Sequence, residues 1–178
     1  MAFIKMSPEV LVASGDVTVI GTDDLFVVKQ MALASPLGRA RICTHLQSTD
    51  TLHEMLITMV RGRYIRPHAH RGKSESLHMV EGELTVVLFG NDGRIQRLVD
   101  LSANGSQDLY YRLAAPTFHT VVLRTQLAVF HETTNGPFIP SDVDFPIWSP
   151  DERDSIGASA FFDQLLEDVG EFRRSEGL

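Results

Sequence analysis

The segment at residues 66–82, RPHAHRGKSESLHMVEG, concentrates the side chains of this chain that are best suited to bind a metal ion. His68 and His70 are two residues apart, so on a β-strand both imidazoles face the same side, roughly 6 Å apart along the strand. Residues 71–74 have the composition of a turn, and Glu75 would begin the next strand, directed back toward the same interior. The spacing therefore predicts that these side chains meet around one ion.

A third histidine, His119, lies far along the chain in the sequence APTFHTVV, at the start of another predicted strand. A closed barrel would bring it beside the first two. Three imidazoles and one carboxylate suit one divalent ion of Fe, Mn, Ni, Co, Cu or Zn. Because Cys43 is the single cysteine, a thiolate-rich zinc site is excluded. Glu75 is open to three interpretations, as a ligand, as a group behind the ligands, or as a catalytic general base.

Two cationic side chains flank these histidines. Arg66 shares strand parity with His68, so it is a candidate to bind a carboxylate or phosphate of a substrate, with a salt bridge to Glu132 as the alternative. Lys73 lies in the turn, where it either contacts substrate or is solvated.

Further polar residues fall on neighbouring strands. Residues 39, 41, 43 and 45 alternate on one strand face that is too polar for a plain core. This face is either a solvated edge or a cationic wall at one end of the barrel, which makes Arg41 and His45 substrate-binding candidates. Either Glu132 or His131 is expected behind the metal ligands, because one strand cannot direct both inward. His53 is expected at the surface or in a structural role.

The rest of the sequence predicts how these residues are held. Short apolar runs, separated by turns, are typical of strands in a sandwich or barrel; they are ARICTHL, EMLITMV, ELTVVLF, RIQRLVDL, DLYYRL, HTVVLR and QLAVFHE. A helix is expected at residues 22–34, with Thr22 as its N-cap, and a second one at 158–174. The second helix has an apolar stripe for packing on the barrel or on a second subunit; the stripe is Phe161, Phe162, Leu165, Leu166, Val169 and Phe172. We expect a single domain over residues 1–178, with the barrel core at 39–140 and an acidic, amphipathic C-terminal helix at 151–178.

Composition and charge indicate which partners and which compartment fit this protein. The net charge of −7 argues against a nucleic-acid partner, which needs a basic face. No apolar run approaches the ~20 residues of a membrane span, and the first residues lack the apolar region of a signal peptide. One cysteine fits a reducing compartment. We therefore expect a cytoplasmic protein without a membrane partner.

The motif resembles that of the cupins. Gly62, His68, His70, Glu75 and Gly82 have the spacing of the first cupin motif, and the proline before His119 resembles the second. A finer similarity, to the WbuC family of cupin-fold metalloproteins, extends over about residues 33–150; it rests on ASPLGRAR, RPHAHRGKSES, VLFGNDGRI, FHTVV, GPF and DFPIWSP. The resemblance implies a mainly β double-stranded β-helix barrel, a metal and, from the association of that family with polysaccharide gene clusters, a sugar-related ligand. It also implies that Glu132, which aligns with the acidic residue four before Gly136-Pro137 in that family, lies behind the metal ligands rather than His131.

Three functions follow as hypotheses. The first is a metal-dependent enzyme that acts on a small polar molecule, as an isomerase or epimerase or, with iron, as a dioxygenase. The second is a non-catalytic binding or regulatory module with a structural or sensing metal. The third is a metal-free cupin that transfers protons, which the intact ligand spacing disfavours. A homodimer is expected.

Overall fold

The N-terminal residues form one edge of a large sheet. The computed structural model of the chain describes residues 3–177. Strands β1 (Phe3–Ser7) and β2 (Val10–Ala13) make an antiparallel hairpin, and β2 then pairs in parallel with β3 (Arg39–Cys43). Helix α1 (Thr22–Ala34) makes the connection between them.

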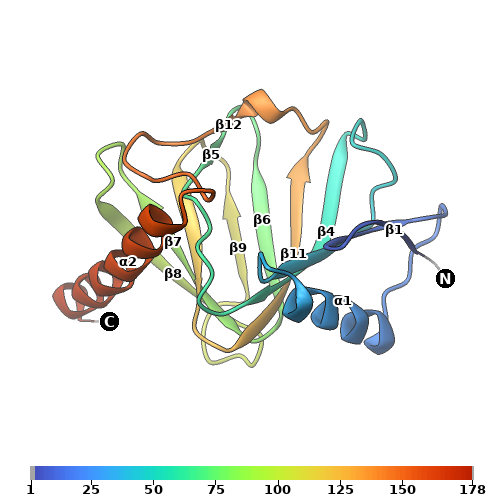
Figure 1. The fold of residues 1–178 in the computed structure, drawn as a ribbon, viewed down its shortest axis with the longest axis horizontal. Helices are drawn as coiled ribbons and strands as arrows, with labels where there is room; N and C mark the ends of the chain where they lie inside the picture. Colours follow the sequence, from blue (N-terminus) through green and yellow to red (C-terminus); the bar gives the residue numbers. More distant parts are fainter. Residues whose placement is uncertain (1–2, 178) are drawn as a thin grey trace.

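Two sheets form the walls of the barrel (Figure 1). One has seven strands in the order β1-β2-β3-β4-β11-β6-β9, and the other has three in the order β10-β7-β8. The remaining strands of these sheets are β4 (Leu52–Val60), β6 (Glu75–Glu81), β7 (Glu83–Phe89), β8 (Ile95–Ser102), β9 (Tyr110–Leu113), β10 (Phe118–Leu123) and β11 (Leu127–Asn135). A turn at residues 90–93 joins β7 to β8 as an antiparallel hairpin. The predicted mainly β barrel, with one helix before it and one after it, is confirmed.

Helix α1 covers the outer face of the large sheet. Val28 and Ala32 are fully buried against Ala40 and Ile42 of β3, so two residues four apart on one side of the helix belong to its packed face. The N-cap lies one residue earlier than predicted, because Gly21 is the N-cap and Thr22 is already helical. The Asp24 carboxylate accepts a hydrogen bond from the Gly21 amide at 2.9 Å, which satisfies an otherwise unpaired donor.

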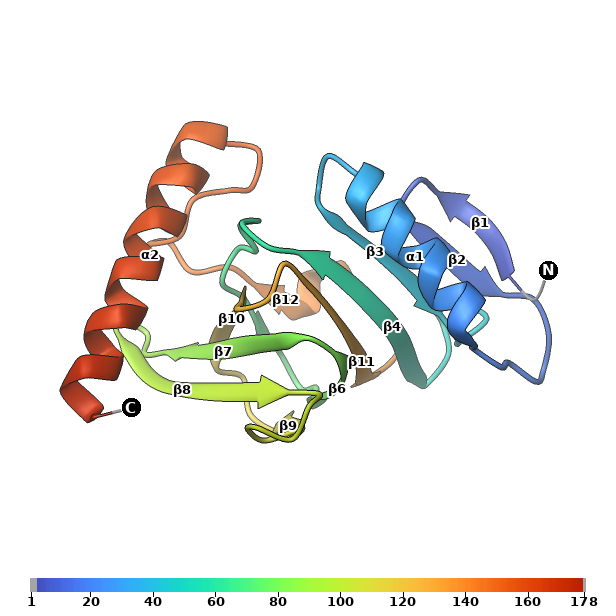
Figure 2. The same ribbon diagram turned by 90° about the horizontal axis from the view of Figure 1, so that it is seen from below.

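Helix α2 (Ser155–Glu176) covers the small sheet at the opposite end of the barrel (Figure 2). It is longer than the predicted 158–174, because Asp154 caps it by accepting a hydrogen bond from the Gly157 amide. Leu165 and Val169 are buried, whereas Leu166 is 44% exposed and lies outside the packed face. In neither helix of the described residues does an apolar stretch reach the length of a membrane crossing.

The proline-bearing segment after β11 crosses the mouth of the barrel. A 3-10 turn at Pro140–Asp142 leads into β12 (Val143–Asp144), which pairs with β5 (Ala69–His70). The pairing places β12 directly beside the predicted metal-binding histidines. An ion pair between Arg71 and Asp144 joins the same two segments.

Candidate metal centre

Backbone pairing brings His68 and His119 together. The His68 amide donates to the His119 carbonyl at 3.0 Å, and the His119 amide donates to the His68 carbonyl at 2.9 Å. Residues that exchange both hydrogen bonds in this way are direct neighbours across two antiparallel segments. Their imidazole centroids are therefore only 4.7 Å apart, although 51 residues of sequence separate them.

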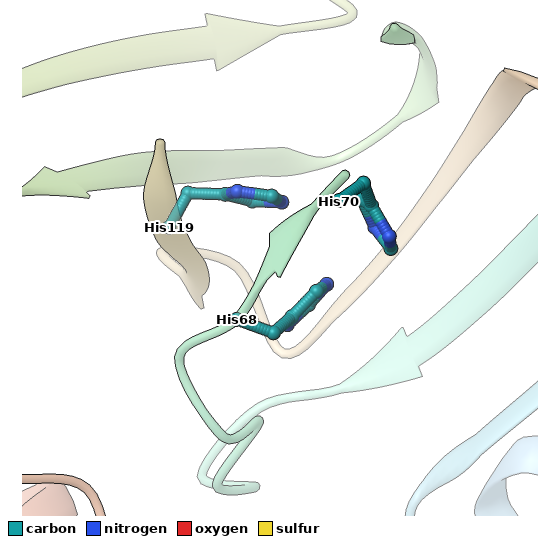
Figure 3. Close-up of side chains that lie close together, drawn as sticks. All are labelled: His68, His70 and His119. Atoms are coloured by element: carbon teal, nitrogen blue, oxygen red, sulfur yellow. The ribbon is translucent and has the colours of Figure 1, made fainter. Parts of the chain in front are cut away.

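His70 completes a cluster of three imidazoles. It lies two residues after His68, with ring centroids 4.9 Å apart, and 5.9 Å from the ring of His119. One nitrogen from each ring lies within 4.8 Å of the other two, and Figure 3 shows the three side chains converging from β5, β10 and the residues before β5. The convergence predicted from sequence parity is thus present in the fold.

Two of the imidazoles have their tautomer fixed by backbone carbonyls. Nδ1 of His68 lies 2.9 Å from the carbonyl oxygen of Arg66, and Nδ1 of His119 lies 2.9 Å from that of Thr117. A carbonyl oxygen only accepts hydrogen bonds, so each Nδ1 carries a proton. Nε2 faces inward, and it is the nitrogen whose lone pair could bind a metal. Burial, together with the neighbouring His119, lowers the pKa of His68 to about 4. His68 is therefore a neutral imidazole at pH 7, as a metal ligand must be.

Glu75, at the start of β6, bridges the other two histidines. Its carboxylate oxygens lie 2.8 Å from Nε2 of His119 and 3.1 Å from Nε2 of His70. Burial by itself would raise the pKa of Glu75, but the hydrogen bonds from the two imidazoles hold it below its usual range. Burial opposes a charge on His119 as well, yet the bond to Glu75 raises the pKa of this imidazole. A metal ion at the three Nε2 atoms would compete with these protons.

A cavity of about 680 Å³ opens from the histidines into the barrel. The polar residues of its wall include Arg41, His45 and Glu132. Burial and the nearby Glu75 raise the pKa of Glu132 to about 8. At neutral pH the Glu132 side chain is therefore a carboxylic acid, able to donate a proton or a hydrogen bond.

A second cavity, of about 510 Å³, lies at the mouth and shares His68 and His70 with the first. Arg66 lines it, with its guanidinium 4.6 Å from the centre of the Phe145 ring. Its salt bridge goes to Asp151 at 3.2 Å. The salt bridge from Arg66 to Glu132, which was the alternative expected from the sequence, is therefore wrong.

Lys73 does not line either cavity. Its ammonium group donates to the carbonyl of Pro137 at 2.6 Å and lies 3.7 Å from the Asp142 carboxylate. It fastens the linker after β11 to the turn before β6, because both partners belong to that linker. The structure thus does not bring Lys73 to the histidines.

His53 was expected at the surface or in a structural role, and its place in the cavity wall was not predicted from the sequence. It is only 4% exposed, lines the larger cavity and stacks on His45 with ring centroids 4.0 Å apart and planes 6° apart. Strand parity with Met55, another residue of the cavity wall, was the available signal. His131 lies elsewhere, with Nε2 3.7 Å from the Glu54 carboxylate, so of these two neighbours on β11 Glu132 is the one that lines the cavity.

The donor set fits a first-row transition metal. His68 and His119 present Nε2 with Nδ1 anchored to a carbonyl, which is the outer hydrogen bond that orients metal-binding imidazoles. His70 supplies a third nitrogen, and Glu75 lies close enough to supply an oxygen. Such an ion would act as a Lewis acid toward a substrate oxygen.

Sequence comparison gives a family model and no close relative. A family described as a domain of unknown function, DUF6016, matches residues 20–101. No curated protein sequence matches the chain. The matched stretch contains His68, His70 and Glu75 but ends before His119.

Structural comparison finds barrels of low sequence identity. CapF, in complex with 3-isopropenyl-tropolone, is 17% identical with a TM-score of 0.49, over 60% of this chain and 31% of CapF. Oxalate oxidase, in complex with glycolate, is 15% identical with a TM-score of 0.46, over 63% of this chain and 57% of the oxidase. A cupin-superfamily sugar phosphate isomerase from Silicibacter pomeroyi is 18% identical with a TM-score of 0.43, over 55% and 59% of the two chains. The chain thus spans from about a third to somewhat over half of the length of these proteins.

Proposed function

We propose that this protein is a mononuclear metal-dependent enzyme that acts on a small polar molecule. The observation that carries the proposal is the convergence of three imidazole nitrogens within 4.8 Å at the wall of a cavity of about 680 Å³. Ligand cavities of enzymes commonly have volumes of 300–1,000 Å³ and a few convergent polar groups. Both conditions hold for this cavity.

The side chains divide into a binding set and a proton-transfer set. His68, His70 and His119 would hold the ion, which supplies polarisation of a carbonyl or hydroxyl oxygen of the substrate. Glu75 lies against the ligands with both carboxylate oxygens in hydrogen bonds, so it is placed to take a proton from a group bound there. Glu132 would be the complementary acid, because its pKa is raised to about 8.

The substrate class is a separate proposal. The resemblance to the WbuC family directs it toward a sugar-related ligand and toward isomerisation or epimerisation. An iron centre would instead favour dioxygenase chemistry.

Solvent exchange tests the proton transfer. The metal-loaded protein is incubated in D₂O with sugar phosphates and nucleotide sugars, and loss of carbon-bound proton signals is followed by NMR. Measurement of oxygen consumption by the iron-loaded protein tests the alternative dioxygenase activity. We expect activity in the wild type and its loss in Glu75→Gln at saturating metal, with Glu54→Gln on β4 of the same sheet as the matched control. Activity that is equal in both variants would contradict the assigned role of Glu75.

A second function is favoured by one feature of the site. Both oxygens of Glu75 already contact ligand imidazoles. If this carboxylate binds the ion as a fourth ligand, the site approaches the closed coordination of a structural or sensing metal. Loss of the metal from Glu75→Gln, without any turnover by the wild type, would support this function.

A further inference from the structure

Arg41 is directed into the barrel by the alternation of β3. Its neighbours Ala40 and Ile42 are buried against helix α1 on the outer face of the sheet. The side chain of Arg41 therefore points to the opposite face, where it lines both the larger cavity and the mouth. It lies at the junction of the two spaces, together with His68 and His70.

Arg41 differs from the other arginines of the mouth in its partners. Arg39 forms a salt bridge with Glu152 at 2.9 Å, and Arg66 and Arg153 both pair with the Asp151 carboxylate. Within residues 3–177, no carboxylate lies within salt-bridge distance of Arg41. Its guanidinium is thus the cation of the mouth that retains the capacity to bind an incoming anion with two parallel hydrogen bonds.

The wall beyond Arg41 is mostly apolar. Val12 of β2 and Met55 of β4 both lie opposite Cys43, two residues further along β3. Met59, Leu77 and Phe130 also line this cavity. Hydroxyl groups placed against such a surface would lose their hydrogen bonds to water without replacement, which is unfavourable.

We infer that the ligand of this cavity is an organic anion with an apolar body, whose carboxylate or phosphate head binds between Arg41 and the three histidines. The inference rests on the proposed function and assigns to its site a substrate class other than the sugar-related ligand that the family resemblance favours. A head group near the ion would contact two positive groups, and a body of the size of one ring would fill the apolar part. This composition differs from that of a free sugar phosphate, whose body is polar on all sides.

Isothermal titration of the metal-loaded protein tests both halves of the inference. The probes are 3-phenylpropanoate, its uncharged analogue 3-phenylpropanamide, phenyl phosphate and glucuronate. We expect 3-phenylpropanoate or phenyl phosphate to bind at least tenfold more tightly than both the amide and glucuronate. The preferred head group distinguishes a carboxylate from a phosphate. Equal binding of the amide would overturn the anionic head, and tighter binding of glucuronate would overturn the apolar body.

Substitution of Arg41 locates the head group. Arg41→Gln is expected to weaken the better anionic probe roughly ten- to hundredfold, as for the loss of a charge-assisted pair of hydrogen bonds. Arg94→Gln is the matched control, because this arginine is 88% exposed and lines neither cavity. Unchanged affinity in Arg41→Gln would contradict the assignment. If that variant does not fold, the comparison of charged and uncharged probes on the wild type still decides whether the cavity binds an anionic head group.

Metal content separates this inference from the proposed function. It is measured on every sample before titration. Metal-loaded protein that binds none of the four probes refutes the apolar anion and leaves the metal centre intact. If the protein takes up no metal, the proposed function is refuted. Anion binding by Arg41 in that metal-free protein would then support the anion site independently of the proposed function.

Discussion

Replacement of Glu75 by Gln tests the electrostatics of the metal-free centre. The Glu75 carboxylate is 7% exposed and accepts hydrogen bonds from His119 at 2.8 Å and His70 at 3.1 Å. An amide keeps the shape of the side chain but carries no charge, and only its oxygen can accept. The variant therefore loses the charge at both bonds and at least one acceptor.

The expected loss follows from these two contacts. A hydrogen bond to a charged group contributes about 1.5–3 kcal/mol, and the amide recovers part of one such bond. We expect the free energy of unfolding of the metal-free protein to fall by about 2–3 kcal/mol. For a domain of this size each kcal/mol shifts Tm by about 2–4 °C, so Tm should fall by about 4–12 °C.

The loss should depend on pH in a particular direction. Because the folded pKa of Glu75 lies below its ordinary value of 4.5, its contribution is present above pH 4.5 and disappears as the pH falls through the lowered pKa. Because the pKa of His119 lies above its ordinary value of 6.5, its contribution is present below pH 6.5 and disappears as the pH rises through the raised pKa. The difference between wild type and variant should thus be largest between these two values and smaller on either side.

Thermal unfolding followed by circular dichroism provides the assay. Both proteins are freed of metal with a chelator and measured from pH 3 to pH 9. Glu54→Gln is the control, because that carboxylate is 43% exposed and only 3.7 Å from His131. A variant that unfolds within 1 °C of the wild type at every pH would refute the assignment of Glu75 to the imidazole pair.

Two further predictions concern how the barrel is fastened. Arg173→Ala should detach α2 from β8, because the Arg173 guanidinium contacts both oxygens of Asp100 at 2.6 Å; we expect a loss of about 1–3 kcal/mol in urea unfolding. Arg173 lowers the pKa of Asp100, so the loss should vanish as the pH falls below the ordinary value of 3.8, and a loss that grows in acid would contradict the pairing. Gly82→Ala should also destabilise the fold by about 1–3 kcal/mol or more, because φ is +76° and a Cβ would overlap the Leu127 carbonyl. Gly105→Ala has a similar φ of +78° in open space, so a loss of equal size in the two variants would exclude the overlap as a cause.

Strand parity and motif spacing predicted the residues that converge at the site. His68 and His70 share a face, and the barrel brings His119 to them by the antiparallel exchange of backbone hydrogen bonds. The strands with alternating apolar residues were found for the same reason, since one of their faces is buried. The positions of Arg41 and Glu132 in the cavity wall also follow from alternation on β3 and β11.

Long-range contacts decided the features that sequence alone did not predict. Arg66 precedes the regular part of β5, which begins at Ala69, so parity did not apply and its partner is set by the linker before α2. Strand β12 has two residues and exists only because it pairs with β5. His53 stacks on His45, eight residues earlier in the loop before β4, a contact that strand parity does not specify. For Arg66 and β12 the deciding neighbour is distant in sequence.

Metal content is the most direct test of the central claim. Elemental analysis of the tag-free protein, after reconstitution with first-row metals and removal of unbound ions, should give about one equivalent in the wild type and in His78→Ala, an exposed histidine outside the cluster. His119→Ala should bind far less, because it lacks one of three converging nitrogens. One equivalent that survives in His119→Ala, or no metal in the wild type, would contradict the three-histidine centre.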